Sequence, residues 1–350
     1  MTRLGDYPVE PERVYLSALP CVHDDAWAWL DVEICATYGD IASRRLAPSP
    51  RGPDDYLDYL DEKSPQIWRT GEMYCLLVDQ RLRPIALARC GRADGVTTRA
   101  MLLPVVATPC AGFVIIRSAE EDAADPSSRD GALYRWASES GLRVRFLDYL
   151  ILGPGRSQIQ SLREMQTRGL GAARRKAEGR DVAGGVCSPS IVSFEWTKVG
   201  VCCTTRGRPP RGPAPPVLTS SKAISQFVHE AVGVSRFPVE EGIVICLDAR
   251  ARPIGIARMS MGAISSAIIS SRDALRAPLM LGAKSFVLLH NHPSGGIDPS
   301  SEDNETTSAV SHAAYLLGMT MKDHVIVTPD PDYYYSYADA GRLPAGEGSL

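Results

Sequence analysis

The segment AKSFVLLHNHPSGGIDPSSED at residues 283–303 combines the signals of a strand, a loop and a helix start. FVLLH (286–290) is a short apolar run typical of a buried strand. Side chains alternate along a strand, so His290 and His292 lie on the same side of its C-terminal end. The loop rich in Gly and Pro can then fold Asp303, in the first turn of the next helix, back toward the two imidazoles.

This combination of side chains predicts a metal site. Two histidine nitrogens and one carboxylate oxygen make a hydrolytic zinc set, which leaves a fourth position for water. Zn²⁺ would lower the pKa of that water, and a nearby Glu could take its proton as a carbonyl is attacked. Glu240, just before the strand GIVICLD, is the candidate for this base.

An internal repeat supports a duplicated α/β (α+β) domain. VDQRLRPIALAR (78–89) resembles LDARARPIGIAR (247–258), and AGFVIIRSAEEDAADPSSRD (111–130) parallels the segment quoted above. Each copy is predicted to contain a helix, two strands joined by a turn, a helix, a short strand, a long helix and a last strand. In the second copy these signals fall at 221–233, 242–248, 252–259, 271–282, 286–290, 301–317 and 324–328.

The first copy lacks the metal-binding side chains. Arg117 and Ala119 stand at the positions of His290 and His292, and Gly71 stands at that of Glu240. We therefore expect a metal-free, degenerate relative that serves as a scaffold, a docking partner or a substrate reader.

The pattern of Glu240, His290-x-His292, seven residues, Ser300, two residues and Asp303 resembles that of the JAMM (MPN+/JAB) metalloproteases. HNHPSG-x-x-x-PS-x-x-D resembles their bacterial RadC-type branch, over about 217–342. The resemblance implies a curved mixed sheet flanked by helices, zinc ligands at His290, His292 and Asp303, Glu240 as the base, and Ser300 steadying the oxyanion. Ser271 replaces the usual proline of the family, and the helix-hairpin-helix region common in RadC-type chains is not recognisable here.

Simpler interpretations exist for several of these residues. Ser300 and Asp303 also form a capping box in its aspartate form, which alone would explain both. Glu241, adjacent to Glu240, corresponds to Glu72 of the first copy and is interpreted as a solvent-facing residue. His324, in the family's closing Asp-His strand, is expected to pack or to support a ligand rather than to bind metal.

The remaining organisation is inferred from composition. We expect an N-terminal extension at 1–48, with a helix-like stretch at 24–46, the degenerate copy at 50–155, a basic, partly disordered linker at 156–216 and the catalytic domain at 217–342 before a tail at 343–350. The chain has 38 Lys+Arg, 41 Asp+Glu and a formal charge of −3, which excludes a nucleic-acid coat over the whole molecule. There is no run of eighteen apolar residues and no secretion signal, so no membrane contact and a cytoplasmic location are expected.

These observations favour a zinc-dependent hydrolase that cleaves a peptide or isopeptide amide, with a protein, peptide or ubiquitin-like conjugate as substrate. The alternative is a DNA-associated accessory protein with a structural or vestigial zinc site, whose Arg-rich stretch at 163–211 contacts phosphate. The two copies are further expected to pack together or to mediate a dimer.

Overall fold

The computed structural model describes residues 71–119, 129–153, 159–167, 216–234, 239–261, 270–292 and 295–344, together with Tyr56 and four backbone segments at 15–16, 30–38, 192–197 and 199–206. The helices are α2 (Thr98–Ala107), α3 (Arg129–Ser138), α4 (Leu162–Thr167), α5 (Ser221–Ala231), α6 (Ser271–Met280) and α7 (Ser301–Leu316). The strands are β1 (Tyr15–Leu16), β2 (Leu30–Tyr38), β3 (Glu72–Val78), β4 (Pro84–Arg92), β5 (Gly112–Ser118), β6 (Arg145–Leu152), β7 (Ile159–Ser161), β8 (Val192–Thr197), β9 (Val199–Arg206), β10 (Glu241–Leu247), β11 (Pro253–Met261), β12 (Ser285–Asn291), β13 (Thr320–Val327) and β14 (Tyr334–Ser336).

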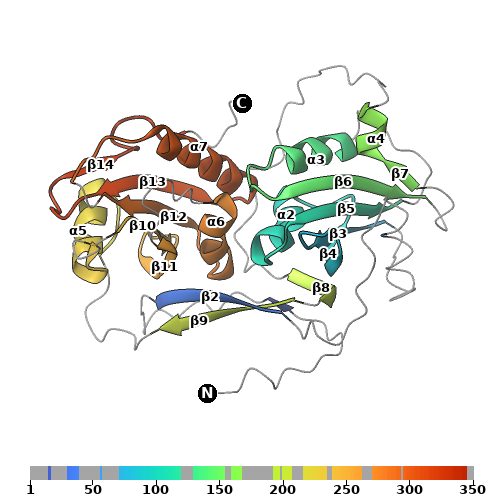
Figure 1. The fold of residues 1–350 in the computed structure, drawn as a ribbon, viewed down its shortest axis with the longest axis horizontal. Coiled ribbons are helices and arrows are strands. Elements are labelled where there is room, and N and C mark those ends of the chain that lie inside the picture. The colour runs from blue at the N-terminus through green and yellow to red at the C-terminus, as the bar shows by residue number, and fades with distance from the viewer. Residues whose placement is uncertain are drawn as a thin grey trace.

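The described residues form two mixed sheets with the same internal pairing (Figure 1). The first runs β1-β8-β4-β3-β5-β6-β7 and the second β14-β13-β12-β10-β11-β2-β9. In each, the first hairpin is antiparallel, its first strand also pairs antiparallel with the next strand, and that strand pairs parallel with its successor. The predicted α/β architecture, with two sheet bodies flanked by helices, is therefore confirmed. We call residues 71–167 the first unit and 216–344 the second unit.

The hairpin turns of the two units share one local structure. The Asp79 carboxylate accepts from the backbone N–H groups of Arg81 and Arg83, and the Asp248 carboxylate accepts from those of Arg250 and Arg252. An aspartate that bonds the backbone two residues on is a recurrent turn-forming device. The repeated D-x-R-x-R-P-I sequence thus encodes a repeated turn.

The two units lie beside each other, with α2 and α6 between the sheets (Figure 1). One continuous apolar core contains buried residues of both, among them Val105 of α2 and Leu275 of α6. Arg276 Nε donates to the Val106 carbonyl over 3.1 Å, and Arg99 Nη1 donates to the Leu317 carbonyl over 2.6 Å. Cationic side chains therefore cap backbone carbonyls across the junction.

Two expectations, for the N-terminal extension and for the linker, need correction. Residues 30–38, within the stretch interpreted as helix-like, form strand β2, which pairs with β9 from Asp31 to Tyr38 and with β11 at one end. The expected linker at 156–216 contributes β7, α4, β8 and β9, so part of it belongs to the two sheets. Strands β2, β8 and β9 pair with strands far away in the sequence, and local composition does not record such pairing.

No helix in the described part of the chain is both long and apolar enough to cross a membrane.

Candidate metal site

The two predicted histidines meet at the C-terminal end of β12. His290 is 2% exposed, and its Nε2 lies 3.0 Å from Nε2 of His292, with the rings tilted by 57°. Nδ1 of His292 lies 2.9 Å from the carbonyl oxygen of Gly296. A carbonyl only accepts, so this Nδ1 carries a proton and Nε2 is the ring nitrogen that faces His290.

Asp303 joins this pair while it caps a helix. Its Oδ1 lies 3.3 Å from His290 Nε2. Its Oδ2 accepts from the backbone N–H and the hydroxyl of Ser300, at 2.9 and 2.7 Å, and the Ser300 hydroxyl in turn accepts from the Asp303 N–H, which completes a capping box. The capping interpretation and the ligand interpretation of Asp303 are therefore compatible, because each uses a different oxygen. The contacts of Ser300 are those of the cap.

Glu240 stands immediately before β10 and faces the histidines. One ligand atom from each of Glu240, His290 and His292 can be chosen so that all three lie within 4.8 Å of one another, a grouping that could hold a metal ion. Asp303 is outside that group and contacts it through His290. The structure thus brings all four predicted groups to one place, and it offers two carboxylates beside the imidazole pair.

The backbone around Glu240 is fixed by Asn291, which lies between the two histidines. Asn291 Oδ1 accepts from the Glu241 N–H at 2.8 Å, and Nδ2 donates to the Val239 carbonyl at 3.0 Å. The sequence-based search did not identify this residue. Its signal is strand alternation, which places Asn291 on the face opposite to the histidines.

Glu241 is buried, so its interpretation as solvent-facing is wrong. It is 5% exposed, and its carboxylate lies 3.4 Å from Nη1 of Arg258. The first unit repeats this pair with Glu72 and Arg89 at 3.1 Å. Because the ion pair of Glu241 recurs in the unit without histidines, a structural role explains Glu241. Glu240 therefore remains the glutamate of the candidate site.

The two carboxylates have pKa values displaced in opposite directions. Burial and, to a smaller extent, the Asp303 charge raise the pKa of Glu240, and the His292 charge opposes this. Burial would also raise the pKa of Asp303, but the His290 charge and the hydrogen bonds from Ser300 outweigh it, so the pKa of Asp303 lies below its usual value. Environments that separate two titratable groups in this way are typical of sites where one holds charge and the other moves protons.

His324 is fully buried behind His290. Its Nε2 lies 2.9 Å from Nδ1 of His290, its Nδ1 lies 2.6 Å from the Thr307 hydroxyl, and its ring stacks on Tyr337 at 5.0 Å with an interplanar angle of 5°. Burial lowers the pKa of His290 to about 4, although Asp303 opposes the shift, and burial also lowers that of His324 well below its usual value. Both rings are therefore neutral at pH 7, and the neutral form is the one in which His290 could bind a metal ion.

The corresponding place in the first unit holds an ion pair. Arg117 Nη2 lies 2.8 Å from Asp130 Oδ2, and the Tyr149 hydroxyl donates to Asp130 Oδ1 at 2.7 Å. Arg117 opposes Met73 of β3 as His290 opposes Gly242 of β10. A guanidinium thus lies beside the aspartate in the unit that lacks the histidines. Ser127, which stands in the first copy where Ser300 stands in the second, lies outside the described residues.

The fold and the site are consistent with a JAB-type domain. In particular, residues 218–342 match the family model of the RadC-like JAB domain, so the chain carries such a domain in its C-terminal part. Proteins named UPF0758 are similar over the same extent. One from Thermotoga maritima is 34% identical over 129 residues, 37% of this chain and 56% of that protein. One from Rubrobacter xylanophilus is 32% identical over 133 residues, 38% of this chain and 56% of that protein. The chain spans about half the length of these relatives.

Proposed function

We propose that the second unit is a zinc-dependent hydrolase that cleaves an amide bond of a peptide or isopeptide. The observation that carries this proposal is the convergence of metal-ligating atoms at the end of β12. His292 Nε2 lies 3.0 Å from His290 Nε2, and Asp303 Oδ1 lies 3.3 Å from the latter. Two imidazole nitrogens and a carboxylate oxygen gathered at one place are a donor set that fits a divalent metal ion.

His290, His292 and Asp303 would hold the ion, which when bound supplies Lewis acidity and a water molecule of lowered pKa. Glu240 stands beside this set, and its pKa, raised by burial, favours a residue that accepts and returns a proton. Asn291 holds the backbone on both sides of Glu240 and so orients that carboxylate. Ser300 contacts the other oxygen of Asp303, in the helix cap.

Metal content measured by mass spectrometry on the purified full chain tests this assignment. We expect one zinc per chain in the wild type, little in His292→Ala or Asp303→Ala, and undiminished zinc in Glu240→Ala. Ser300→Ala is the matched control for Asp303→Ala, because it removes the cap hydroxyl and leaves the carboxylate.

Loss of zinc in Glu240→Ala with retention in Asp303→Ala would exchange the roles of the two carboxylates. A folded wild type that takes up no zinc, even after the metal is added, would refute the proposal. Zinc-loaded wild type is then to be screened for cleavage of amide-linked peptide substrates, with Glu240→Ala as the inactive, metal-retaining control.

The alternative of DNA binding through 163–211 gains no support from the site. Residues 168–191, 198 and 207–211 of that stretch lie outside the described part of the chain.

A further inference from the structure

A backbone carbonyl determines which atoms donate and which accept in the chain of hydrogen bonds behind His290. The Thr307 hydroxyl lies 2.6 Å from the Asp303 carbonyl oxygen and 2.6 Å from Nδ1 of His324. The carbonyl can only accept, so the single hydroxyl proton points to it. The hydroxyl oxygen must therefore accept from His324, which places a proton on His324 Nδ1.

The position of the proton on His324 determines the position of the proton on His290. A buried imidazole without a carboxylate partner is neutral, because desolvation disfavours its charged form. With Nδ1 protonated, Nε2 of His324 is an acceptor, and it lies 2.9 Å from Nδ1 of His290. His290 must then donate through Nδ1, which leaves its Nε2 with a lone pair directed toward His292 and Asp303.

We propose that His324 and Thr307 are positioning residues that fix His290 as the Nδ1–H tautomer and hold its Nε2 ready to bind a metal ion. This inference rests on the proposed function and adds the groups that prepare its most buried ligand. The ring of His324 is itself held by its stack on Tyr337, and Thr307 lies one helical turn after Asp303, so α7 supports two ligands at once.

The first test reads the tautomer directly. The full chain has only six histidines, so ¹⁵N-histidine labelling of metal-free protein gives few ring signals, which single His→Gln variants assign. We expect His290 protonated at Nδ1 in the wild type. In Thr307→Val the acceptor for His324 Nδ1 is lost, so we expect the His324 proton to move to Nε2 and the His290 proton to follow to Nε2. Thr306→Val, a buried neighbour on the same helix, leaves the wild-type pattern.

The second test measures zinc affinity by competition with a chromophoric chelator. Loss of an outer hydrogen-bond partner of a ligand costs roughly 10–100-fold in metal affinity. We expect a loss of this size in His324→Phe, which keeps a ring to stack on Tyr337, and in Thr307→Val. Thr306→Val should match the wild type.

The inference is overturned if metal-free His290 carries its proton on Nε2, or if Thr307→Val changes neither the tautomer nor the affinity. Thr307→Val decides the matter even where His324→Phe fails to fold. A wild type without zinc affinity would instead refute the proposed function. The ring signals would still show whether Thr307 and His324 fix the tautomer of His290.

Discussion

The Asp303 carboxylate uses its two oxygens for different partners, one for the helix cap and one for His290. Ser300→Ala should therefore lower the free energy of unfolding of the metal-free protein by about 1 kcal/mol, the usual effect of a lost N-cap, while zinc content stays unchanged. Asp303→Ala should lower the free energy of unfolding and should also lose the bound zinc. Urea denaturation and metal analysis of the two variants measure these effects. Equal loss of zinc in both would show that the cap, rather than the free oxygen, carries the binding.

Asn291 provides a second prediction for a single side chain. Its amide satisfies the Glu241 N–H and the Val239 carbonyl, on either side of Glu240. Asn291→Ala should cost about 1–3 kcal/mol of stability, because a buried donor and its neighbouring acceptor lose their partner. Hydrogen exchange at the Glu241 amide should accelerate, with zinc retained. Asn291→Asp keeps the acceptor, so it should preserve protection at Glu241. Unchanged exchange in Asn291→Ala would contradict the assigned role.

Helix α7 is the element that connects the site to the rest of the molecule, and its C-terminus shows what fixes its length. Gly318 has φ = 68°, its N–H donates to the Tyr315 carbonyl, and the Met319 N–H donates to that of Ala314. This is the Schellman arrangement, which favours glycine. Gly318→Ala should destabilise the protein by about 1 kcal/mol. A Cβ there would meet only Arg99, at 3.8 Å, so the cost is conformational.

Thermal or urea denaturation checks the prediction for Gly318. Gly95→Ala is the control, since that glycine does not have a left-handed backbone and a Cβ there meets nothing within 4 Å. An equal effect in both variants would mean that the helix end is not the cause.

Local signals predicted the elements that carry the site, and distant pairing decided those that were misread. The strand before His290, the start of α7 at Ser301 and the capping box follow from periodicity and cap residues within a few positions. Strand β2 was misread because its pairing partner β9 lies more than 150 residues away along the chain. Asn291 and Thr307 were missed for a related reason, since their partners come from other elements.

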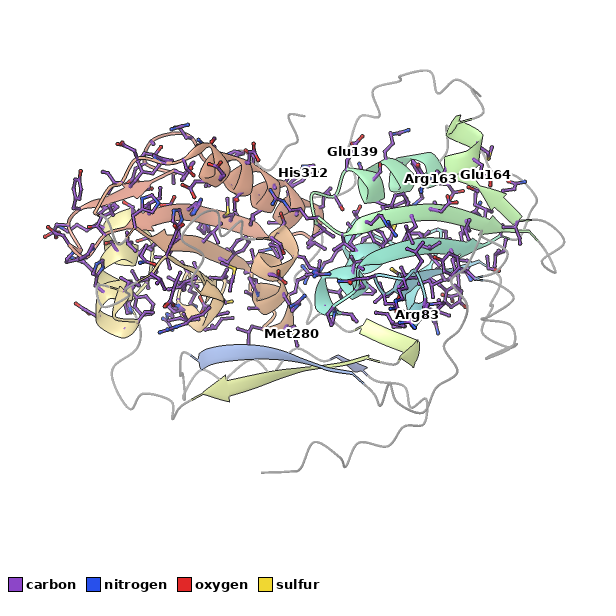
Figure 2. The ribbon with its side chains drawn as sticks, viewed as in Figure 1. Arg83, Glu139, Arg163, Glu164, Met280 and His312 are labelled. Carbon is purple, nitrogen blue, oxygen red and sulfur yellow. The ribbon has the colours of Figure 1, made fainter. Side chains whose placement is uncertain are left out.

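At the scale of the whole molecule, the two units share a core and a set of charged hydrogen bonds across their junction. Arg99 and Arg276 each donate to a backbone carbonyl of the other unit. His312 Nε2 donates to the Glu139 carbonyl over 3.0 Å where α7 meets the end of α3, and both residues are labelled in Figure 2. Because α7 also carries Asp303, the first unit contacts the helix that contributes this carboxylate to the candidate site. This arrangement predicts that the units unfold together.

The distribution of tryptophan makes that prediction measurable, because all five tryptophans precede residue 217. Tryptophan fluorescence thus reports the N-terminal part of the chain, and circular dichroism reports the whole. In the wild type the two urea transitions should coincide, as expected for one cooperative unit. In Arg99→Met/Arg276→Met, two charge-assisted bonds of about 1.5–3 kcal/mol each are lost, so stability should fall and the transitions should separate. Arg83→Met, whose partner Asp79 lies in the same turn and away from the junction, should leave them coincident. Coincident transitions of unchanged midpoint in the double variant would mean that the apolar core alone couples the two units.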